Sequence, residues 1–456
     1  MLGAGRQGQA LVRFMAEHGA SVTLSDAKPL DQLSDAVKNL SDLPVVWAAG
    51  GHPLSLLEGK DCVFVTGGAN LQIPILQEAT RRNIPIKNDT AVFLDRVSAP
   101  VIGITGSSGK TTTTTLVGRI AEAAAKPEQK VWIGGNIGLP LLTFADKIKP
   151  EDIVILELSS FQLELQTRSP HISAILNITP NHLDRHGTME NYISAKKRIY
   201  SFQNENDFVI LSRDNDVTSG MINEIKDHLF TFGFDRPASL KEDTAVFLEG
   251  DQIKCLSHSG KDISEEVLLP VSLIELRGRH NISNVMAACA ISKAAGFTAA
   301  SITAGITGFK GVEHRLQFIR RYHGAAWYND SIATAPERTL AAVHSFTEPL
   351  IMLLGGRDKK LPWDELAHAL QGRARWIFLF GEAEPMIETV LKKADPKGEG
   401  PKIVCCEDLE NAVKKAAEVC ADGDVVLLSP GGTSYDAFKD FEERGRKYTE
   451  WVNQLS

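Results

Sequence analysis

The chain has 456 residues, and its 49 basic and 57 acidic side chains give a formal net charge of −8. At roughly 150 residues per domain, this length predicts about three domains. With 43% hydrophobic and 23% charged residues, the composition is that of a globular protein and excludes a disordered chain. No block of lysine and arginine stands out, so we expect no nucleic-acid partner.

Membrane and cysteine features favour the cytoplasm. No apolar run approaches the roughly 20 residues that cross a bilayer, and we expect no signal peptide ahead of the first glycines. The six cysteines include no C-x-x-C pair, which suits reduced thiols and argues against a disulfide framework or a zinc knuckle. We therefore expect a cytoplasmic protein without a membrane partner.

The opening stretch MLGAGRQGQALVRFMAEHGASVTLSD predicts the end of a strand, a glycine turn, a helix and a second strand. Gly3, Gly5 and Gly8 match G-x-G-x-x-G, and Asp26 follows the second strand near the position of a ribose-binding acid. The pattern predicts a nucleotide-binding turn, and a glycine turn without a ligand is the alternative. Few residues precede the turn, whereas a buried parallel strand has about 4–8 apolar residues, so we expect a truncated first strand.

Further along, apolar runs alternate with amphipathic stretches, which predicts an α/β fold with parallel sheets. A helix-like stretch stops at Pro100, and the strand VIGIT follows it. Alternation on both sides of Glu249-Gly250-Asp251 predicts a hairpin, hence a small antiparallel addition to the middle segment. The glycine-rich stretch GITGFKG marks a last boundary. We expect domains at residues 1–97, 98–310 and 311–456.

The strongest local signal is VIGITGSSGKTTTTT, a β-branched strand that runs through glycines into a helix. Gly106 and Gly109 let backbone N–H groups face a phosphate, Lys110 reaches the β- and γ-phosphates, and Thr111 can hold Mg²⁺. The strict G-x-x-x-x-G-K-[ST] pattern is not met, because Ile104 occupies the first glycine position. An ordinary glycine-rich turn is the alternative.

Polar residues follow two later strands. Glu157 ends the run DIVILE, and a carboxylate there faces the ligand crevice of an α/β sheet, where it could coordinate magnesium. His182, Asp184 and His186 cluster after SAILNIT, and a helix then presents Lys196–Lys197. Satisfied polar histidines and a solvated lysine pair are the alternatives.

Together these motifs resemble those of the Mur ligases, the ATP-dependent amino-acid ligases of peptidoglycan (cell wall) synthesis. The resemblance spans the chain in order, through GITGSSGKTTTT, GGNIG, ELSSFQLE, NITPNHLDRHG, AKKRIY, GRHNISN, GVEHRLQ, YNDSIATAPE, LLGGRDKKLPWDEL and SPGGTSYDAFKDFEERG. It implies Rossmann-like N- and C-terminal domains around a central ATP-binding domain. It also implies a monomer that joins glutamate to UDP-N-acetylmuramoyl-L-alanine through an acyl phosphate, with release of ADP and phosphate.

The resemblance also assigns roles to individual residues. It places one Mg²⁺ on Thr111 and Glu157 and a second on His182 and Lys196, with the lysine as a carbamate formed with CO₂. The implied catalytic residues are Lys110, Glu157, His182 and Lys196. The implied ATP contacts are Gly106, Gly109, Lys110, Thr111, Thr112, Asn281, Asn284, Arg315 and Asp330. The implied contacts to the UDP substrate are Gly5, Arg6, Gln7, Asp26, Gly68 and Asn136. Those to glutamate are Thr334, Lys359, Ser434 and Phe441.

Several of these assignments have alternatives. Asn281 could be a helix N-cap. Lys360 lies next to Lys359, so either lysine could match the family's glutamate-binding position. Ile332 stands where the family usually has a lysine. Gly431-Gly432-Thr433 replaces the family's usual small, cysteine-containing run before Ser434. Because Ile332 removes a cation that would face an acidic substrate, both D- and L-glutamate remain possible substrates.

Three other functional classes compete with this interpretation. A folylpolyglutamate-synthase-like ligase shares the ATP core, but the N-terminal UDP-type segment argues against it. An NAD-dependent dehydrogenase would use GAGRQG and has no need of the phosphate loop. A P-loop switch would release phosphate from ATP without depending on either substrate.

Overall fold

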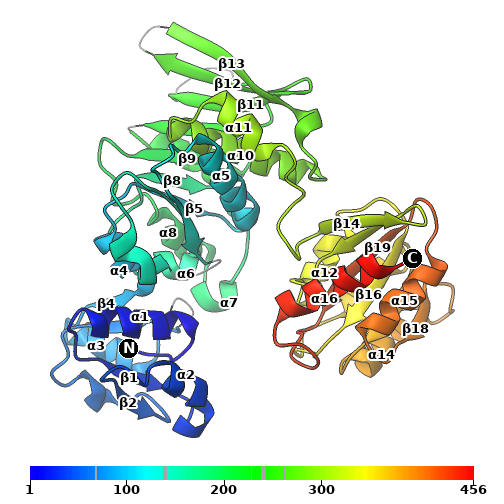
Figure 1. Ribbon diagram of the computed structural model, residues 1–456, viewed down its shortest axis with the longest axis horizontal. Coiled ribbons are helices and arrows are strands. Elements are labelled where there is room, and N and C mark those ends of the chain that lie inside the picture. The colour runs from blue at the N-terminus through cyan, green and yellow to red at the C-terminus, as the bar shows by residue number, and fades with distance from the viewer. Residues whose placement is uncertain (67–68, 137–140, 227, 238–242, 260–261) are drawn as a thin grey trace. The chain divides into compact units, whose positions relative to one another are not determined.

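The computed structural model describes residues 1–66, 69–136, 141–226, 228–237, 243–259 and 262–456, and it has an α/β fold (Figure 1). The chain forms two compact units. Unit 1 comprises Met1–Glu275 with Arg279–Phe309, and unit 2 comprises Leu276–Gly278 with Lys310–Ser456. No helix within the described ranges is long and apolar enough to span a bilayer. All six cysteines are free thiols.

Unit 1 begins with a small parallel sheet in which Leu2 lies between two strand pairs. Leu2 bridges in parallel to Ser25 of β1 and to Val65 of β3, while β1 pairs with β2 and β3 with β4. The only residue of the first strand that pairs is therefore Leu2. The elements here are α1 (Arg6–Glu17), β1 (Thr23–Asp26), η1 (Leu30–Leu33), α2 (Ser34–Asn39), β2 (Val46–Ala49), η2 (Leu54–Leu57), β3 (Val63–Val65), α3 (Pro74–Arg81), β4 (Ile86–Asn88) and α4 (Asp89–Arg96).

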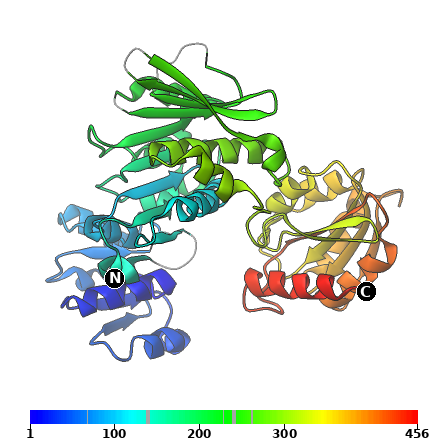
Figure 2. The same ribbon diagram turned by 45° about the horizontal axis from the view of Figure 1, so that its top comes forward.

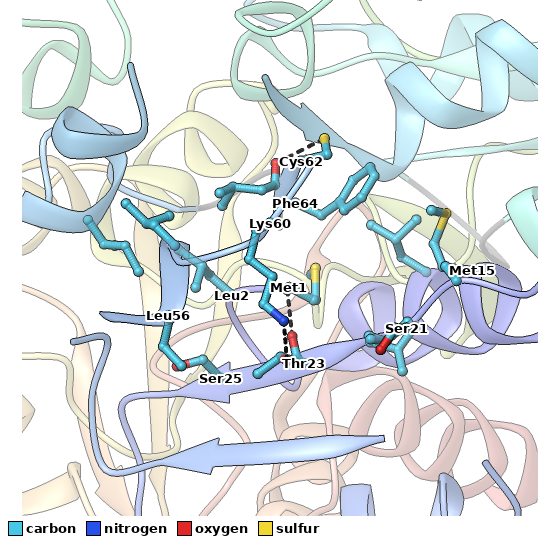
Figure 3. Close-up of a pocket in the computed structure, with 17 residues that line it drawn as sticks. Met1, Leu2, Met15, Ser21, Thr23, Ser25, Leu56, Lys60, Cys62 and Phe64 are labelled. Atoms are coloured by element: carbon cyan, nitrogen blue, oxygen red, sulfur yellow. Dashed lines mark hydrogen bonds between the residues drawn. The ribbon is translucent and has the colours of Figure 1, made fainter. Parts of the chain in front are cut away.

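A hollow lies beside Leu2 (Figure 3). Its lining is mostly apolar and includes Met1, Leu11 and Val63. At its edge Lys60 Nζ donates to Thr23 Oγ1 at 3.1 Å. The hollow surrounds the starts of β1 and β3, whereas the glycine turn follows Leu2 at the other end of these strands. It is therefore separate from the predicted nucleotide-binding turn.

The larger sheet of unit 1 has nine strands in the order β13-β12-β11-β10-β9-β8-β5-β7-β6. Pairing is parallel from β6 to β11, and β11-β12-β13 is antiparallel, which confirms the predicted hairpin at residues 249–251. The strands are β5 (Val101–Thr105), β6 (Val131–Gly135), β7 (Ile153–Glu157), β8 (Ile172–Ile175), β9 (Phe208–Ser212), β10 (Leu229–Gly233), β11 (Thr244–Glu249), β12 (Gln252–Ser259) and β13 (Asp262–Pro270).

Helices cover this sheet. Helix α5 packs on β7 and contacts α10 and α11, and α10 also contacts β9, β10 and β11 (Figure 2). Every residue of β5, β7 and β8 is buried, as expected for parallel strands covered on both faces. The helices are α5 (Lys110–Ala124), η3 (Leu141–Lys147), α6 (Ser160–Leu163), α7 (Leu183–His186), α8 (Met189–Lys197), α9 (Asp216–Met221), η4 (Ile222–Glu224), η5 (Val271–Leu273), α10 (Arg279–Ala294) and α11 (Ala299–Ile306).

Unit 2 has one six-stranded sheet in the order β14-β15-β19-β16-β17-β18, parallel except for β14. Leu350, Met352 and Leu354 of β16 face one buried core and Ile351 and Leu353 face another, because side chains alternate along a strand. The elements are β14 (Gln317–Tyr322), β15 (Ala325–Asn329), α12 (Pro336–Val343), β16 (Leu350–Gly355), α13 (Asp364–Leu370), β17 (Ala374–Phe380), α14 (Glu384–Ala394), β18 (Lys402–Cys405), α15 (Leu409–Val419), β19 (Val425–Gly431) and α16 (Phe441–Gln454).

Candidate active site

The predicted phosphate loop lies between β5 and the N-terminus of α5, the geometry in which backbone amides and the helix dipole favour an anion. Gly109 is the N-cap of α5 with φ +79°, and a Cβ there would lie 2.2 Å from Asn284 Oδ1. Only glycine fits this position. Ser107 Oγ donates to the carbonyl of Thr179 at 3.0 Å, which ties the loop to the segment after β8.

Two lysines converge on this loop. Lys110 Nζ donates to the carbonyl of Gly106 at 2.9 Å, and Lys196 Nζ donates to the same carbonyl at 3.0 Å. Lys196 is 1% exposed, and burial, with a smaller effect of Lys110, lowers its pKa well below the usual value against the opposing effect of Glu157. Lys197 behaves differently, because its Nζ forms a surface ion pair with Glu224 at 2.6 Å. Of this pair, Lys196 is therefore the lysine that lies at the phosphate loop.

Glu157 ends β7 and is 2% exposed. Asn136 Nδ2 donates to its Oε1 at 2.9 Å, while Oε2 is buried and has no partner among the described residues. A buried carboxylate oxygen without a partner is costly, and a hard cation such as Mg²⁺ is the natural partner for it. The oxygen donors of Glu157 and the half-buried Thr111 fit magnesium, although no cluster of three His, Cys, Asp or Glu side chains occurs in the described part of the chain.

The two histidines of the predicted cluster have different surroundings. His182 is exposed, is the N-cap of α7 and has φ +53°, with its ring 5.2 Å from that of Phe161. His186 is instead buried, and its Nδ1 and Nε2 lie 2.9 Å from Glu164 Oε1 and 3.0 Å from Ser160 Oγ. The side chain of Asp184 lies outside the described residues. The motifs assigned a metal to His182, gave His186 no role of its own and did not reveal its contact with Glu164.

The two asparagines predicted to contact adenine lie together. Asn284 Nδ2 donates to Asn281 Oδ1 at 3.1 Å, and Asn284 borders Gly109 of the phosphate loop. The alternative that Asn281 is a helix N-cap is wrong, because α10 already begins at Arg279.

The N-terminal glycines meet local steric demands. Gly3 has φ +95°, and a Cβ on Gly8 would lie 2.1 Å from the carbonyl oxygen of Gly3, so helix α1 packs closely on the turn. Gly5 is the N-cap of α1, whose first turn contains Arg6 and Gln7. Asp26 accepts from the amide of Ala4 at 2.8 Å. Gly68 and the side chain of Arg6 lie outside the described residues.

In unit 2, Lys359 and Lys360 are both exposed, and Lys359 Nζ donates to Thr334 Oγ1 at 3.1 Å, whereas Lys360 has φ +59°. Of the two neighbouring lysines, this contact favours Lys359 as the one predicted to bind glutamate. Burial, followed by the cations Arg338 and Arg444, lowers the pKa of Lys359.

A second group in unit 2 centres on Asp330, which is 5% exposed and accepts from Ser429 Oγ at 2.8 Å and from the amide of Leu316 at 3.2 Å. Burial raises its pKa to about 7, and the hydrogen bond from Ser429 and the cations Arg315 and Arg338 oppose that rise. Arg315 and Asp330, both predicted to contact ATP, are therefore brought together.

Arg444 is a buried residue that the motif analysis did not single out. It is fully buried, and its guanidinium donates to Ser331 Oγ at 3.0 Å, to the Ser331 carbonyl at 2.9 Å and to the Gly432 carbonyl at 3.2 Å. Ser331 Oγ in turn donates to the carbonyl of Phe441 at 2.8 Å. Burial lowers the pKa of Arg444 to about 10. These hydrogen bonds of Arg444 and Ser331 thus hold in place the segments that carry Ser434 and Phe441. Ser434 is 2% exposed.

Known proteins resemble this chain over its whole length. The Mur ligase middle domain matches residues 104–292, and the Mur ligase glutamate ligase domain matches residues 314–432. UDP-N-acetylmuramoylalanine--D-glutamate ligases of Symbiobacterium thermophilum and Koribacter versatilis are each 38% identical to it, over 100% of this chain and 98% and 97% of their own.

Solved structures share the fold. The UDP-N-acetylmuramate-alanine ligase of Thermotoga maritima is 20% identical, with a TM-score of 0.56 over 99% of this chain and 98% of its own. A murein peptide ligase of Psychrobacter arcticus is 16% identical, with a TM-score of 0.52 over 100% of this chain and 98% of its own.

Proposed function

The chain belongs to the Mur ligase family of ATP-dependent, amide-forming ligases, and we propose that it joins D-glutamate to UDP-N-acetylmuramoyl-L-alanine in peptidoglycan synthesis. The observation that carries the proposal is the full-length identity of 38% to ligases named for that reaction. The choice of D-glutamate rests on those relatives alone, because Ile332 leaves the site without the family's usual lysine.

We propose that the phosphate loop holds ATP, with Gly106, Gly109 and Thr112 around the phosphates. The amides of the loop and Lys110 would neutralise charge on the γ-phosphate as the substrate carboxylate attacks it. Asn281 and Asn284 would hold the adenine, which their position against Gly109 supports. Thr111 and Glu157 would bind a first Mg²⁺, which would supply further neutralisation of the phosphate oxygens.

We propose that Lys196 reacts with CO₂ to form a carbamate that binds a second Mg²⁺ together with His182. A charged ammonium has no lone pair for CO₂ or for a metal. Burial already disfavours the ammonium form of Lys196, which supports the assignment. The carbamate would replace a buried cation with an oxygen donor.

The remaining assignments are also proposals. We propose a three-domain arrangement with boundaries at 97/98 and 310/311, of which the first lies inside unit 1. The proposed UDP-substrate residues are Gly5, Arg6, Gln7, Asp26, Gly68 and Asn136, and the last of these already orients Glu157. Arg315 and Asp330 would contact ATP, and Thr334, Lys359, Ser434 and Phe441 would hold glutamate. The six free thiols support a cytoplasmic location, and we propose a monomer there.

Phosphate release from ATP tests the reaction. We expect release only when UDP-N-acetylmuramoyl-L-alanine and glutamate are both present, and with D- rather than L-glutamate. Release that ignores both substrates would contradict the ligase, and release with L-glutamate alone would reassign the stereochemistry.

Substitutions of the neighbouring residues Lys196 and Lys197 test whether Lys196 forms a carbamate. Lys196→Ala should lose nearly all activity, and wild-type activity should fall when bicarbonate and CO₂ are removed. Lys197→Ala, which removes the neighbouring surface lysine, should retain both activity and its response to bicarbonate. An active Lys196→Ala variant that is indifferent to bicarbonate would contradict the assignment.

A further inference from the structure

Helix α7, which begins after His182, is a single turn of four residues. So short a helix has too few hydrogen bonds to persist by itself. Its N-cap His182 is also held at φ +53°, a backbone conformation that a non-glycine residue keeps only when its surroundings impose it. Some neighbouring contact must therefore hold this turn in place.

The C-terminal residue of α7, His186, makes that contact. Its side chain is 1% exposed, and its Nδ1 lies 2.9 Å from Glu164 Oε1. An ionised carboxylate only accepts, so Nδ1 carries the proton and donates. Nε2 lies 3.0 Å from Ser160 Oγ, a residue of the short helix α6 that follows the strand of Glu157. His186 thus joins α7 to the segment after Glu157.

The same residue also reaches the helix of Lys196. The carbonyl of His186 accepts from Asn191 Nδ2 at 2.9 Å, and its ring centre lies 5.1 Å from that of Tyr192, both in α8. The hydroxyl of Tyr192 lies 3.0 Å from Ser107 Oγ in the phosphate loop. His186 therefore contacts the segment after Glu157 and the helix of Lys196, and Tyr192 links that helix to the phosphate loop.

Phe161 completes the arrangement. Its ring stacks on that of His186 with centroids 5.2 Å apart and an interplanar angle of 7°, and the centroid of the His182 ring also lies 5.2 Å from that of Phe161. The two histidines are thus coupled through one aromatic ring as well as through the single turn between them.

We propose that His186, held by Glu164 and Ser160, is a positioning residue that presents His182 to a divalent cation. This role rests on the proposed function. In this role the hydrogen-bonded chain Glu164–His186–Ser160 orients the metal ligand His182.

Metal binding tests the proposal without relying on turnover. Mn²⁺ would be titrated into the protein with a non-hydrolysable ATP analogue and followed by electron paramagnetic resonance. His186→Phe keeps a ring against Phe161 and Tyr192 but lacks both nitrogens, and we expect its Mn²⁺ affinity to fall by about tenfold. His228→Phe is the matched control, because it removes another histidine–carboxylate pair of unit 1, with Asp243 at 3.0 Å, away from the site.

A double-mutant comparison shows whether the effect passes through His182. Because His186 acts on the metal only through His182, His182→Ala and the double variant His182→Ala/His186→Phe should bind Mn²⁺ equally weakly. Additive losses, or a His186→Phe variant with wild-type affinity, would overturn the proposal. Wild-type protein that binds no Mn²⁺ would overturn the proposed function as well, which distinguishes the two failures.

Glu164 provides a second route if His186→Phe does not fold. Its side chain is 21% exposed, so replacement is tolerable. Glu164→Gln keeps an oxygen that accepts from Nδ1 and should bind Mn²⁺ nearly as wild type, whereas Glu164→Ala should bind it several-fold more weakly. Equal affinities of the two variants would contradict the positioning role.

Discussion

Replacing Asp330 by asparagine should make unit 2 more stable at alkaline pH. Burial raises the pKa of Asp330 from the usual 3.8 to about 7, so the native state holds its proton where the unfolded chain has lost it. The unfolded state therefore binds fewer protons between these two pKa values, and the free energy of unfolding falls as pH rises through that window. Above about pH 7 the native state carries the full cost of the buried charge, about 4 kcal/mol at roughly 1.4 kcal/mol per pKa unit.

Asparagine has the same shape without the charge. It can accept from the amide of Leu316, and the hydroxyl of Ser429 can rotate to accept from its amide nitrogen. Between pH 5 and pH 8.5 about two pKa units of the window are crossed, so the stability advantage of Asp330→Asn should grow by about 3 kcal/mol.

Urea unfolding at both pH values measures this advantage, with the fluorescence of the buried Trp327 in the adjoining strand as a probe of unit 2. Asp424→Asn is the control, because Asp424 is buried but paired with Arg375 at 2.6 Å, and its loss should destabilise the protein. Parallel stability profiles of wild type and Asp330→Asn would refute the reasoning. ATP-dependent turnover of Asp330→Asn should fall, since we propose that this carboxylate contacts ATP.

Three glycine substitutions test the packing within unit 1. Gly109→Ala places a Cβ 2.2 Å from Asn284 Oδ1 at φ +79° and should weaken ATP-analogue binding by roughly a hundredfold in calorimetry; wild-type affinity would contradict the clash. Gly305→Ala places a Cβ 2.6 Å from the backbone of Ile120 and should lower the free energy of unfolding by about 2 kcal/mol in urea titrations. Gly220→Ala, in α9, meets nothing within 4 Å and should slightly raise the melting temperature in calorimetry; a large loss there would undermine the Gly305 interpretation.

Local demands explain why much of the candidate site could be predicted from sequence. Gly109 must adopt positive φ at the start of α5, and Gly8 must let α1 approach the turn, so each glycine is required by its own chain neighbourhood. Likewise Glu157 follows a run of apolar residues that is typical of a buried strand. This run predicted that its carboxylate lies at the C-terminal end of the parallel strands.

Contacts across long sequence separations could not be predicted in this way. His186 resembled His182 as a polar residue after a strand, but its partner Glu164 lies on another element, and nothing in the spacing indicates that pair. Arg444 was not singled out from the sequence, yet it is fully buried and donates to the hydroxyl and carbonyl of Ser331 and to the carbonyl of Gly432. Asn281 was also ambiguous as a cap, because helix ends are the least predictable feature of a sequence.

The arrangement around the Gly106 carbonyl links the proposed roles of ATP, Mg²⁺ and CO₂. Two lysine nitrogens donate to this one oxygen, and Lys110 and burial together disfavour the charge on Lys196. Carbamate formation would replace that disfavoured cation with an anion, which attracts Lys110 but is repelled by Glu157, whose Oε2 already lacks a partner among the described residues. A divalent cation would relieve that repulsion, so under the proposed assignment the carbamate and Mg²⁺ would stabilise each other, and by linkage each would raise the affinity of the site for the other.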